Sequence, residues 1–416
     1  MKNPVRAVLV VASMVACALA RAAEMPAPKT PSPAVQVTQL ARGLANPWSF
    51  AFLPDGGILI TEAYGTMRIL RPDGVLSAPL EGVPPVKAVA AQGLHDVLLD
   101  PDFARNHVLY FTYLQPARGE KGGVWPVEHW YQNVWNLPLA ERRRIDIGTE
   151  VLARARLAPG NERLTDVEVL VEGAERRIAL AKDGTLLVTG ADRFRFYESK
   201  YDGTDHEFTD NPDLLRNFTG RVLRVNRDGS LPVDNPWMSR ATVEGATWAH
   251  GLRDPQGAAI HPVTGELWVS DHGPQGGDEI DIIKPGKDYG WPNVSHGDQY
   301  DFQRTDGRKN VPVGKGRHSA PGVEEPVHWW AKDIGPSGML FYTGDVFPVW
   351  KNNLFVGGLT SQSLVRLVLD GNRIVAEEHL LKDLKRRVRD VRQGPDGTVY
   401  VLAGDGLFRL TPAKMP

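Results

Sequence analysis

Apolar residues along this chain come in short runs, each followed by a turn rich in proline, aspartate and glycine and then by a second run. The second run is dominated by Val, Leu, Ile and Thr, which are residues that favour strands. Long segments with the helical spacing of apolar positions are scarce. Pairs of short strands joined by Asp-Gly turns are typical of β-hairpins. The pattern therefore predicts a mainly β protein.

This two-strand unit recurs six times along the chain. The six copies are 48–61, 97–112, 178–189, 257–270, 339–357 and 391–402. Further strands are expected between them, at 67–70, 221–225 and 364–369. Such repetition favours an all-β fold, a six-bladed β-propeller of four-stranded antiparallel blades with its ligand site at one mouth of the channel. A β-sandwich followed by a second domain would explain the density of turns but not the sixfold recurrence.

The N-terminus has the pattern of an export signal, in which basic residues precede an apolar run over residues 7–20 and small residues follow. The only cysteine, Cys17, lies inside this run, so the exported chain would have no disulfide. Lipoprotein processing at Cys17 is the alternative to cleavage at the alanine sites at the end of the run, and in both cases the protein would be periplasmic or secreted. The expected organisation is a signal peptide at 1–22, a proline-rich linker at 23–36 and the propeller at 37–416.

Charge and hydropathy exclude several classes of partner. The formal net charge is −2 at pH 7, and acidic and basic residues are spread along the chain. We therefore expect neither a nucleic acid nor an anionic membrane surface as the partner. After the N-terminal run, no stretch approaches the roughly 18 uninterrupted apolar residues that a membrane-spanning helix needs.

The segment 250–292 is unusually dense in glycine, proline, carboxylates, arginine and glutamine. Its glycines and prolines allow the backbone to turn sharply and to approach a ligand closely. Asp278 and Glu279 follow at once, so carbonyl and carboxylate oxygens converge as a hard cation such as calcium requires. Arg253 and Gln256 offer planar hydrogen-bonding groups, which suit a flat and acidic ligand.

Four blocks of the chain resemble the soluble pyrroloquinoline quinone (PQQ)-dependent aldose and glucose dehydrogenases, the glucose/sorbosone dehydrogenase family. The blocks are Asn-Pro-Trp-Ser-Phe at 46–50 with Leu-Ile-Thr-Glu at 59–62, Gly-Leu-His-Asp-Val at 93–97 with Asp-Pro-Asp-Phe at 100–103, the segment 253–292, and Pro-Ser-Gly-Met at 336–339 through Arg-Val-Arg-Asp-Val at 387–391. The third block is the most specific. The resemblance implies a six-bladed propeller with PQQ at its mouth and bound calcium.

In such enzymes PQQ accepts a hydride from C1 of an aldose, which becomes a lactone, while a general base takes the proton of the C1 hydroxyl. The resemblance implies that Arg253 polarises the reactive carbonyl of the cofactor. The carbonyls of Gly273 and Pro274 would bind the calcium that holds PQQ, and Glu279 with the Tyr289 carbonyl a second, structural calcium. An unidentified electron acceptor would reoxidise the cofactor, in a monomer or homodimer. The implied cofactor contacts are Arg253, Gln256, Trp330, Arg387, Arg389 and Gln92.

The chain also departs from the family pattern near this site. When the motif is aligned on Arg177, the family's base histidine corresponds to Gly173, and a small residue of the motif to Arg176. The asparagine after the polarising arginine is Asp254, and a cofactor lysine is replaced by Thr360. A positioned base commonly contributes about 10²–10⁴-fold in rate, so its loss matters. His95 is the candidate substitute base; the alternative is a buried histidine with a structural hydrogen bond.

Two classes of function therefore remain open. One is a sugar dehydrogenase whose base has moved. The other is a catalytically silent or altered propeller, either a carbohydrate-binding protein or a lactonase-like calcium hydrolase, which would need several side-chain carboxylates and an asparagine around its metal. The loop 120–136 supplies aromatic residues that would stack on sugar faces or, alternatively, pack the loop against the protein, namely Trp125, Trp130, Tyr131 and Trp135. His129 in the same loop is expected at the surface.

Overall fold

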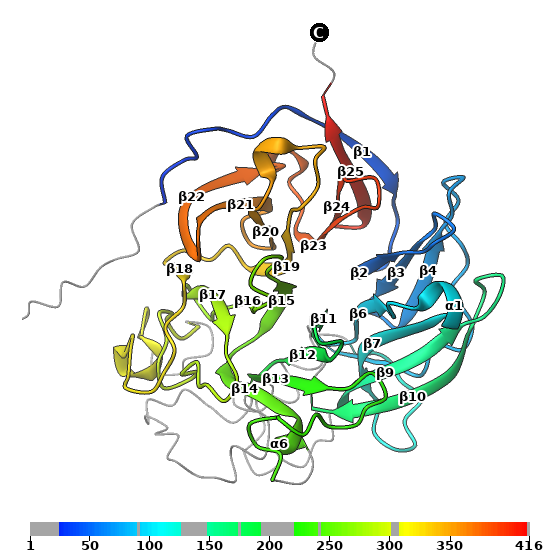
Figure 1. The fold of residues 1–416 in the computed structure, drawn as a ribbon, viewed down its shortest axis with the longest axis horizontal. Coiled ribbons are helices and arrows are strands. Elements are labelled where there is room, and N and C mark those ends of the chain that lie inside the picture. Colours follow the sequence, from blue (N-terminus) through cyan, green and yellow to red (C-terminus); the bar gives the residue numbers. More distant parts are fainter. Residues whose placement is uncertain are drawn as a thin grey trace, which may run out of the picture.

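Six antiparallel sheets stand around a central axis as the blades of a propeller (Figure 1). The computed structural model describes residues 25–89, 92–125, 148–173, 176–192, 220–239, 243–300 and 308–413. Within these residues five sheets have four strands and one has three, and a separate pair of short parallel strands lies beside them. The six-bladed propeller that the repeats predict is confirmed.

The blades are numbered along the chain, and their strands are given from the innermost outwards. Blade 1 consists of β2 (Pro47–Phe52), β3 (Ile58–Glu62) and β4 (Thr66–Leu70). Blade 2 consists of β6 (Leu94–Leu99), β7 (Val108–Gln115), β9 (Thr149–Leu157) and β10 (Leu164–Glu172). Blade 3 consists of β11 (Ile178–Leu180), β12 (Leu186–Gly190), β13 (Gly220–Val225) and β14 (Thr247–Leu252). Blade 4 consists of β15 (Pro255–Ile260), β16 (Leu267–Asp271), β17 (Asp278–Ile283) and β18 (His328–Trp330). Blade 5 consists of β19 (Pro336–Phe341), β20 (Leu354–Gly358), β21 (Ser363–Asp370) and β22 (Arg373–Leu380). Blade 6 consists of β23 (Val388–Gln393), β24 (Val399–Ala403), β25 (Gly406–Pro412) and β1 (Val35–Ala41).

The remaining elements are short. They are the parallel strands β5 (Lys87–Val89) and β8 (Gly123–Trp125), the helices α1 (Phe103–Asn106) and α6 (Val243–Ala246), and the 3₁₀ turns η2 (Val313–Gly316), η3 (Pro348–Trp350) and η4 (Lys382–Leu384). Within the described ranges, no helix has the length and apolar character needed to cross a membrane.

Each predicted two-strand unit forms the first two strands of one blade. The unit 48–61 becomes β2 and β3, and the unit 391–402 becomes β23 and β24. The central strands β3, β12, β20 and β24 are buried at every position, because the neighbouring blades cover both of their faces. They consequently consist largely of apolar residues rather than alternating ones.

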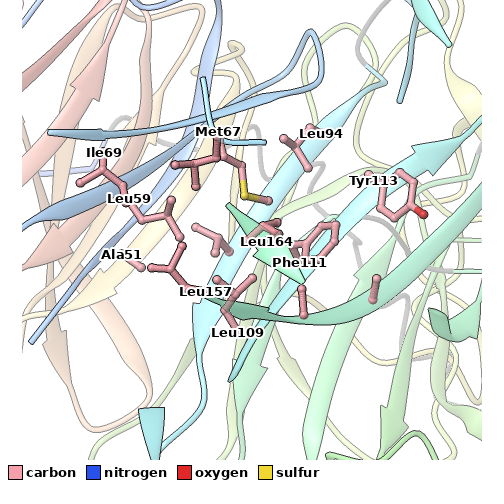
Figure 2. Close-up of a cluster of buried hydrophobic side chains, with 14 of the residues drawn as sticks. Ala51, Leu59, Met67, Ile69, Leu94, Leu109, Phe111, Tyr113, Leu157 and Leu164 are labelled. Atoms are coloured by element: carbon pink, nitrogen blue, oxygen red, sulfur yellow. The ribbon is translucent and has the colours of Figure 1, made fainter. Parts of the chain in front are cut away.

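The core lies between adjacent blades. Figure 2 shows the cluster between blades 1 and 2, in which Leu59 and Met67 from blade 1 meet Leu94 and Phe111 from blade 2. All four side chains are fully buried. The innermost strands of successive blades contact one another around the ring, so their ends lie together around the central channel.

The N-terminal strand completes the last blade. β1 pairs with β25 in an antiparallel arrangement that places Val35 opposite Pro412, so residues from the two ends of the chain close the ring. The described part of the predicted proline-rich linker is extended and also contacts blade 5. The Glu377 amide donates to the Pro26 carbonyl at 3.0 Å, and the Trp350 indole donates to the Ser32 hydroxyl at 2.8 Å.

Blade 1 differs from the four-stranded prediction. In place of a regular fourth strand, its outer edge carries an isolated bridge between Leu70 and Leu76 and a few backbone hydrogen bonds, such as that from the Ser77 amide to the Ile69 carbonyl at 2.8 Å. The Ser77 hydroxyl accepts the Ile69 amide at 2.9 Å, and Pro79 has no amide hydrogen to donate. A side chain and a proline thus take the place of part of a regular ladder.

Candidate cofactor site at the channel mouth

The channel contains a buried ion-pair network. The Asp96 carboxylate accepts hydrogen bonds from the Ser49 hydroxyl at 2.5 Å and from the Arg392 guanidinium at 2.6 Å. Arg177 lies 3.3 Å from Asp96 and 3.1 Å from Asp390. Burial alone would raise the pKa of Asp96, but the two guanidinium groups and the hydrogen bonds hold it below its ordinary value. The network joins the innermost strands of blades 1, 2 and 6 to the residues just before β11 in blade 3.

A chain of polar contacts lies beside this network, at the starts of the innermost strands. The Arg176 Nε donates to Asp254 Oδ1 at 2.8 Å, and Gln256 Nε2 donates to Asp254 Oδ2 at 2.8 Å. The Gln256 Oε1 in turn accepts a hydrogen bond from Arg389 at 2.5 Å. The contacts link blades 3, 4 and 6 and define one mouth of the channel, which we call the mouth site.

His95 and Gln92 reach the same place from blade 2. One terminal nitrogen of Arg176 lies 3.4 Å from Gln92 Oε1 and 3.4 Å from each ring nitrogen of His95. The His95 ring also stacks on Trp48, with 4.7 Å between the ring centroids. His95 is fully buried. The structure thus brings the predicted base to the mouth site and covers it.

Arg253 lies between β14 and β15, and its side chain reaches the glycine-rich loop that follows β16. Its guanidinium donates to the carbonyl of Gly273 at 2.8 Å and to the His272 carbonyl. The loop turns at Gly276 and Gly277, whose φ angles of 74° and 71° favour glycine. Arg253 therefore contacts one of the carbonyl oxygens that the resemblance assigns to calcium.

Asp278 stabilises this loop through hydrogen bonds to backbone amides. Its carboxylate accepts the amides of Gly273 at 2.9 Å, Ile334 at 2.8 Å and Gly335 at 2.9 Å. These bonds occupy both carboxylate oxygens, so Asp278 supports the loop backbone instead of facing a ligand. Pro274 is buried in the same loop.

Three buried or half-buried carboxylates lie on one face of blade 4. Asp271 is the cross-strand partner of Glu279, and Asp281 follows two residues later, so all three point to the same side of the sheet. Burial, and then repulsion between the carboxylates, raises the pKa of Glu279 well above its ordinary value. Burial also raises the pKa of Asp271 to about 7, and Asp281 Oδ2 is buried without a hydrogen-bond partner. Tyr289 packs in the adjacent core cluster, near enough for Asp281 to raise its pKa.

Calcium fits this cluster only with help from other oxygens. In the described part of the chain, no three His, Cys, Asp or Glu side chains converge closely enough to hold a metal ion by themselves. A calcium ion here would therefore need backbone carbonyls or water as further ligands, which calcium accepts readily. The buried, partnerless oxygen of Asp281 and the mutual repulsion of its neighbours are what a bound cation would relieve.

Of the remaining predicted cofactor residues, Arg387 lies beside the mouth site, whereas Trp330 lies on β18, the outermost strand of blade 4. Arg387 is exposed and lies two residues before Arg389, close enough for its charge to help lower the pKa of Arg389. Trp330 is buried between blades 4 and 5, where its indole donates to Glu377 at 2.8 Å. The role of Trp330 as a ring near the cofactor stays a prediction. His129, Trp130, Tyr131 and Trp135 lie outside the described residues, and Trp125 is the last residue of β8.

The position that would carry the family's base has an unusual backbone. Gly173 has a φ of 97°, and its amide donates to the Glu150 carbonyl at 2.9 Å. This left-handed conformation is costly for a residue with a β-carbon. The backbone at this position therefore favours glycine.

The mouth site is electropositive. Burial, followed by repulsion from Arg387, Arg177 and Arg176, lowers the pKa of Arg389 to about 9. Burial likewise lowers the pKa of His272 to about 4, so this ring is neutral at pH 7 and does not add to the charge. A guanidinium held among other guanidiniums is stabilised by an anion, and planar forks of this kind suit carboxylates.

Comparison with known proteins identifies the family to which this chain belongs. The sequence pattern described as Glucose / Sorbosone dehydrogenase matches residues 44–410. The chain belongs to the glucose/sorbosone dehydrogenase family. All residues of the mouth site lie within the matched range, and the family resemblance expected from the sequence is confirmed.

Relatives within the family cover almost the whole chain. The chain is 33% identical over 382 residues to the aldose sugar dehydrogenase YliI of Escherichia coli, covering 91% of this chain and 93% of that protein. It is 26% identical over 416 residues to the quinoprotein glucose dehydrogenase B of Acinetobacter calcoaceticus, covering 86% and 83%. A crystal structure of a glucose dehydrogenase is 34% identical, with a TM-score of 0.73 over 91% of this chain and 100% of that one. The similarity thus extends over the propeller as a unit.

Sequence reasoning missed several residues that the fold brings together. Asp271 joins Glu279 only through the pairing of β16 with β17. Asp281 could have been found from the sequence, because the alternation along β17 places it on the same face as Glu279. The alignment singled out Arg176 as a departure but not as a partner of Asp254, which is 78 positions away.

Proposed function

We propose that this protein is a PQQ- and calcium-dependent dehydrogenase that oxidises the C1 hydroxyl of aldose sugars to give lactones. The observation that carries the proposal is the cluster of Arg253, Gln256, Arg387 and Arg389 at the mouth of a propeller of this family. Family membership and the aldose sugar and quinoprotein relatives support the same function.

The donor set of the mouth site fits PQQ. This cofactor is planar and carries three carboxylates, and three arginines with one glutamine amide are matched to it in charge and shape. The lowered pKa of Arg389 reflects first its burial and then repulsion from the neighbouring arginines, and a bound anion would offset both. When bound, PQQ supplies the hydride acceptor. Arg253, Gln256, Arg387 and Arg389 would bind and orient it.

His95 is the proposed proton acceptor for the C1 hydroxyl. Like the implied cofactor contact Gln92, it lies 3.4 Å from Arg176, and its ring orientation is held by stacking on Trp48. Asp254 is not a suitable base, because the charges of Arg176 and Arg253 outweigh its burial and keep its pKa below the ordinary value. A sugar can reach the buried His95 ring only after Arg176 or a neighbouring side chain moves.

Calcium has two proposed places. The carbonyls of Gly273 and Pro274 would hold the ion next to the cofactor, where Arg253 now contacts the Gly273 oxygen. Glu279, with the Tyr289 carbonyl, would hold a structural ion, and the position of Asp281 adds a further carboxylate to that set. The N-terminal pattern further supports export to the periplasm, where a separate electron acceptor would be needed.

Reconstitution tests this proposal. Purified protein freed of calcium is mixed with PQQ and calcium, and binding is followed by calorimetry and by PQQ absorbance. An aldose and an artificial electron acceptor are then added. We expect binding and dye reduction, with His95→Ala at least about tenfold slower because it lacks the base. His261→Ala, a histidine at the turn between β15 and β16, is the matched control and should keep the wild-type rate.

Absence of both heat and an absorbance change would refute the cofactor assignment, and a wild-type rate in His95→Ala would exclude His95 as the base.

One pair of observations favours a second candidate, a cofactor-binding propeller without turnover. His95 is fully buried, and the backbone at Gly173 leaves no base in the usual place. PQQ binding without dye reduction across several sugars would establish it. Lactone hydrolysis or sugar binding without PQQ would instead favour the lactonase-like or carbohydrate-binding alternative.

A further inference from the structure

Two departures from the family pattern are in direct contact. The motif that the chain resembles has a small residue at the position of Arg176 and an asparagine at the position of Asp254. Here the Arg176 Nε lies 2.8 Å from Asp254 Oδ1. The side chains are only 3% and 19% exposed, respectively, so water screens the pair weakly. The two unusual residues therefore form one part-buried ion pair.

Each replacement would be unfavourable without the other. A carboxylate at position 254 can only accept hydrogen bonds, and it lies where an anionic cofactor is expected to bind. Arg176 alone would be a buried cation without its nearest carboxylate. Together they add one positive and one negative charge, so the exchange leaves the net charge of the mouth site unchanged.

The pair also acts on the residues beyond it. Because Asp254 accepts on both oxygens, it requires the amide nitrogen of Gln256 to face it. The amide oxygen of Gln256 must then face the opposite way, toward Arg389 at 2.5 Å. Arg176 thus influences the orientation of Arg389 through two intermediate side chains. With an asparagine at position 254, the amide of Gln256 would have no such fixed direction.

We infer that Arg176 and Asp254 are a coupled pair of replacements, in which Arg176 neutralises Asp254 and, through Asp254 and Gln256, holds Arg389 in position for a polyanionic cofactor. Arg176 is accordingly a positioning residue for the cofactor. The charges of Arg253, Arg387 and Arg389 remain available for three carboxylates. This inference rests on the proposed PQQ-binding function.

A double-mutant cycle tests the coupling. Wild type, Arg176→Ser, Asp254→Asn and the double variant are titrated with PQQ in the presence of calcium, by calorimetry and absorbance. Arg176→Ser should weaken PQQ binding at least about tenfold, because it leaves a carboxylate without its partner among the cofactor's carboxylates. Asp254→Asn introduced into Arg176→Ser should recover at least about fivefold. Arg154→Ser is the control, since it removes an Arg–Glu168 pair of the same 2.8 Å length on blade 2 and should bind within about twofold of wild type.

The alternative outcomes are distinct. An equal loss from Arg176→Ser in both backgrounds, or no loss in either, would overturn the coupling while leaving the proposed function intact. A wild-type protein that binds no PQQ would overturn the proposed function together with the cofactor part of this inference.

Urea unfolding of the four cofactor-free proteins separates folding from binding. The unfolding midpoint should fall in Arg176→Ser and recover in the double variant. Additive midpoints would overturn the pairing itself.

Discussion

Replacing Asp96 by asparagine removes one of the two carboxylates that neutralise Arg177 and Arg392 in the channel. The Asp96 side chain is 1% exposed, and its Oδ2 accepts the Ile178 amide at 2.8 Å. Asparagine has nearly the same shape, so the substitution creates no cavity. Its amide nitrogen would face the Ile178 N–H, however, and two donors would then oppose each other.

The expected loss of stability follows from these contacts. The unsatisfied Ile178 amide costs about 1–3 kcal/mol. The two guanidinium groups would share Asp390 alone, and removal of one partner from a buried ion pair typically costs about 3–5 kcal/mol. Because the groups form one network, these costs do not add fully, and we expect a total of about 3–5 kcal/mol. This is a large part of the roughly 5–15 kcal/mol that stabilises a typical domain.

Urea unfolding followed by tryptophan fluorescence measures this loss. Trp48 is a built-in reporter, because the Arg177 guanidinium lies 4.1 Å from its ring centroid. Asp102→Asn is the matched control, since Asp102 is 44% exposed and pairs with the exposed Arg105, and it should change stability by less than about 0.5 kcal/mol. A loss below about 1 kcal/mol in Asp96→Asn, at an unchanged dependence on urea, would refute the view that the network holds the blades together.

Three further predictions concern charge. Arg389→Gln should weaken PQQ binding by about 10- to 100-fold in calorimetry, because Arg389 is half-buried at the mouth site. Arg387→Gln should weaken it by less than about tenfold, because Arg387 is exposed. Equal losses would contradict this difference in burial between the two arginines. Burial raises the pKa of Asp271 to about 7, so the calcium-free native state keeps a proton that the unfolded chain releases near pH ~4. The Tm of the calcium-free protein should therefore fall from pH 5 to pH 8, and added calcium should raise the Tm more at pH 8 than at pH 5. An equal rise in Tm at both pH values would argue against calcium binding by carboxylates. Burial and the neighbouring His318 lower the pKa of His296 to about 4, so the unfolded chain binds a proton more readily and stability should fall as the pH drops from about 6.5 toward 4. His296→Gln should flatten this part of the Tm profile, and an unchanged slope would assign it to other groups.

The parts of the fold that sequence predicted are those in which neighbours along the chain are also neighbours in space. The hairpin 178–189 is an example, because its Asp183-Gly184 turn and its apolar runs act within a few residues. The pairing of β1 with β25 was not predicted, since it joins the two ends of the chain and no local pattern specifies it. The irregular edge of blade 1 was missed for a related reason, as Ser77 competes with the backbone of a strand already formed.

The same division holds for the mouth site. Motif position sufficed to select Arg253, Gln256 and Arg389, because the family pattern keeps them at recognisable spacings. Motif position did not indicate which carboxylate pairs with which arginine, because these pairs form only where strand ends from different blades meet at the channel mouth.

The amino-acid sequence by itself determined six hairpins, a propeller and a set of planar cationic groups suited to a flat anion. The tertiary structure alone decided that Arg176 contacts Asp254, that His95 is covered and that Asp271 joins Glu279. The physical reason is that turn chemistry and apolar periodicity act over a few residues, whereas the charge balance of a buried site is set by side chains from separate blades that come within hydrogen-bonding distance only when the ring closes.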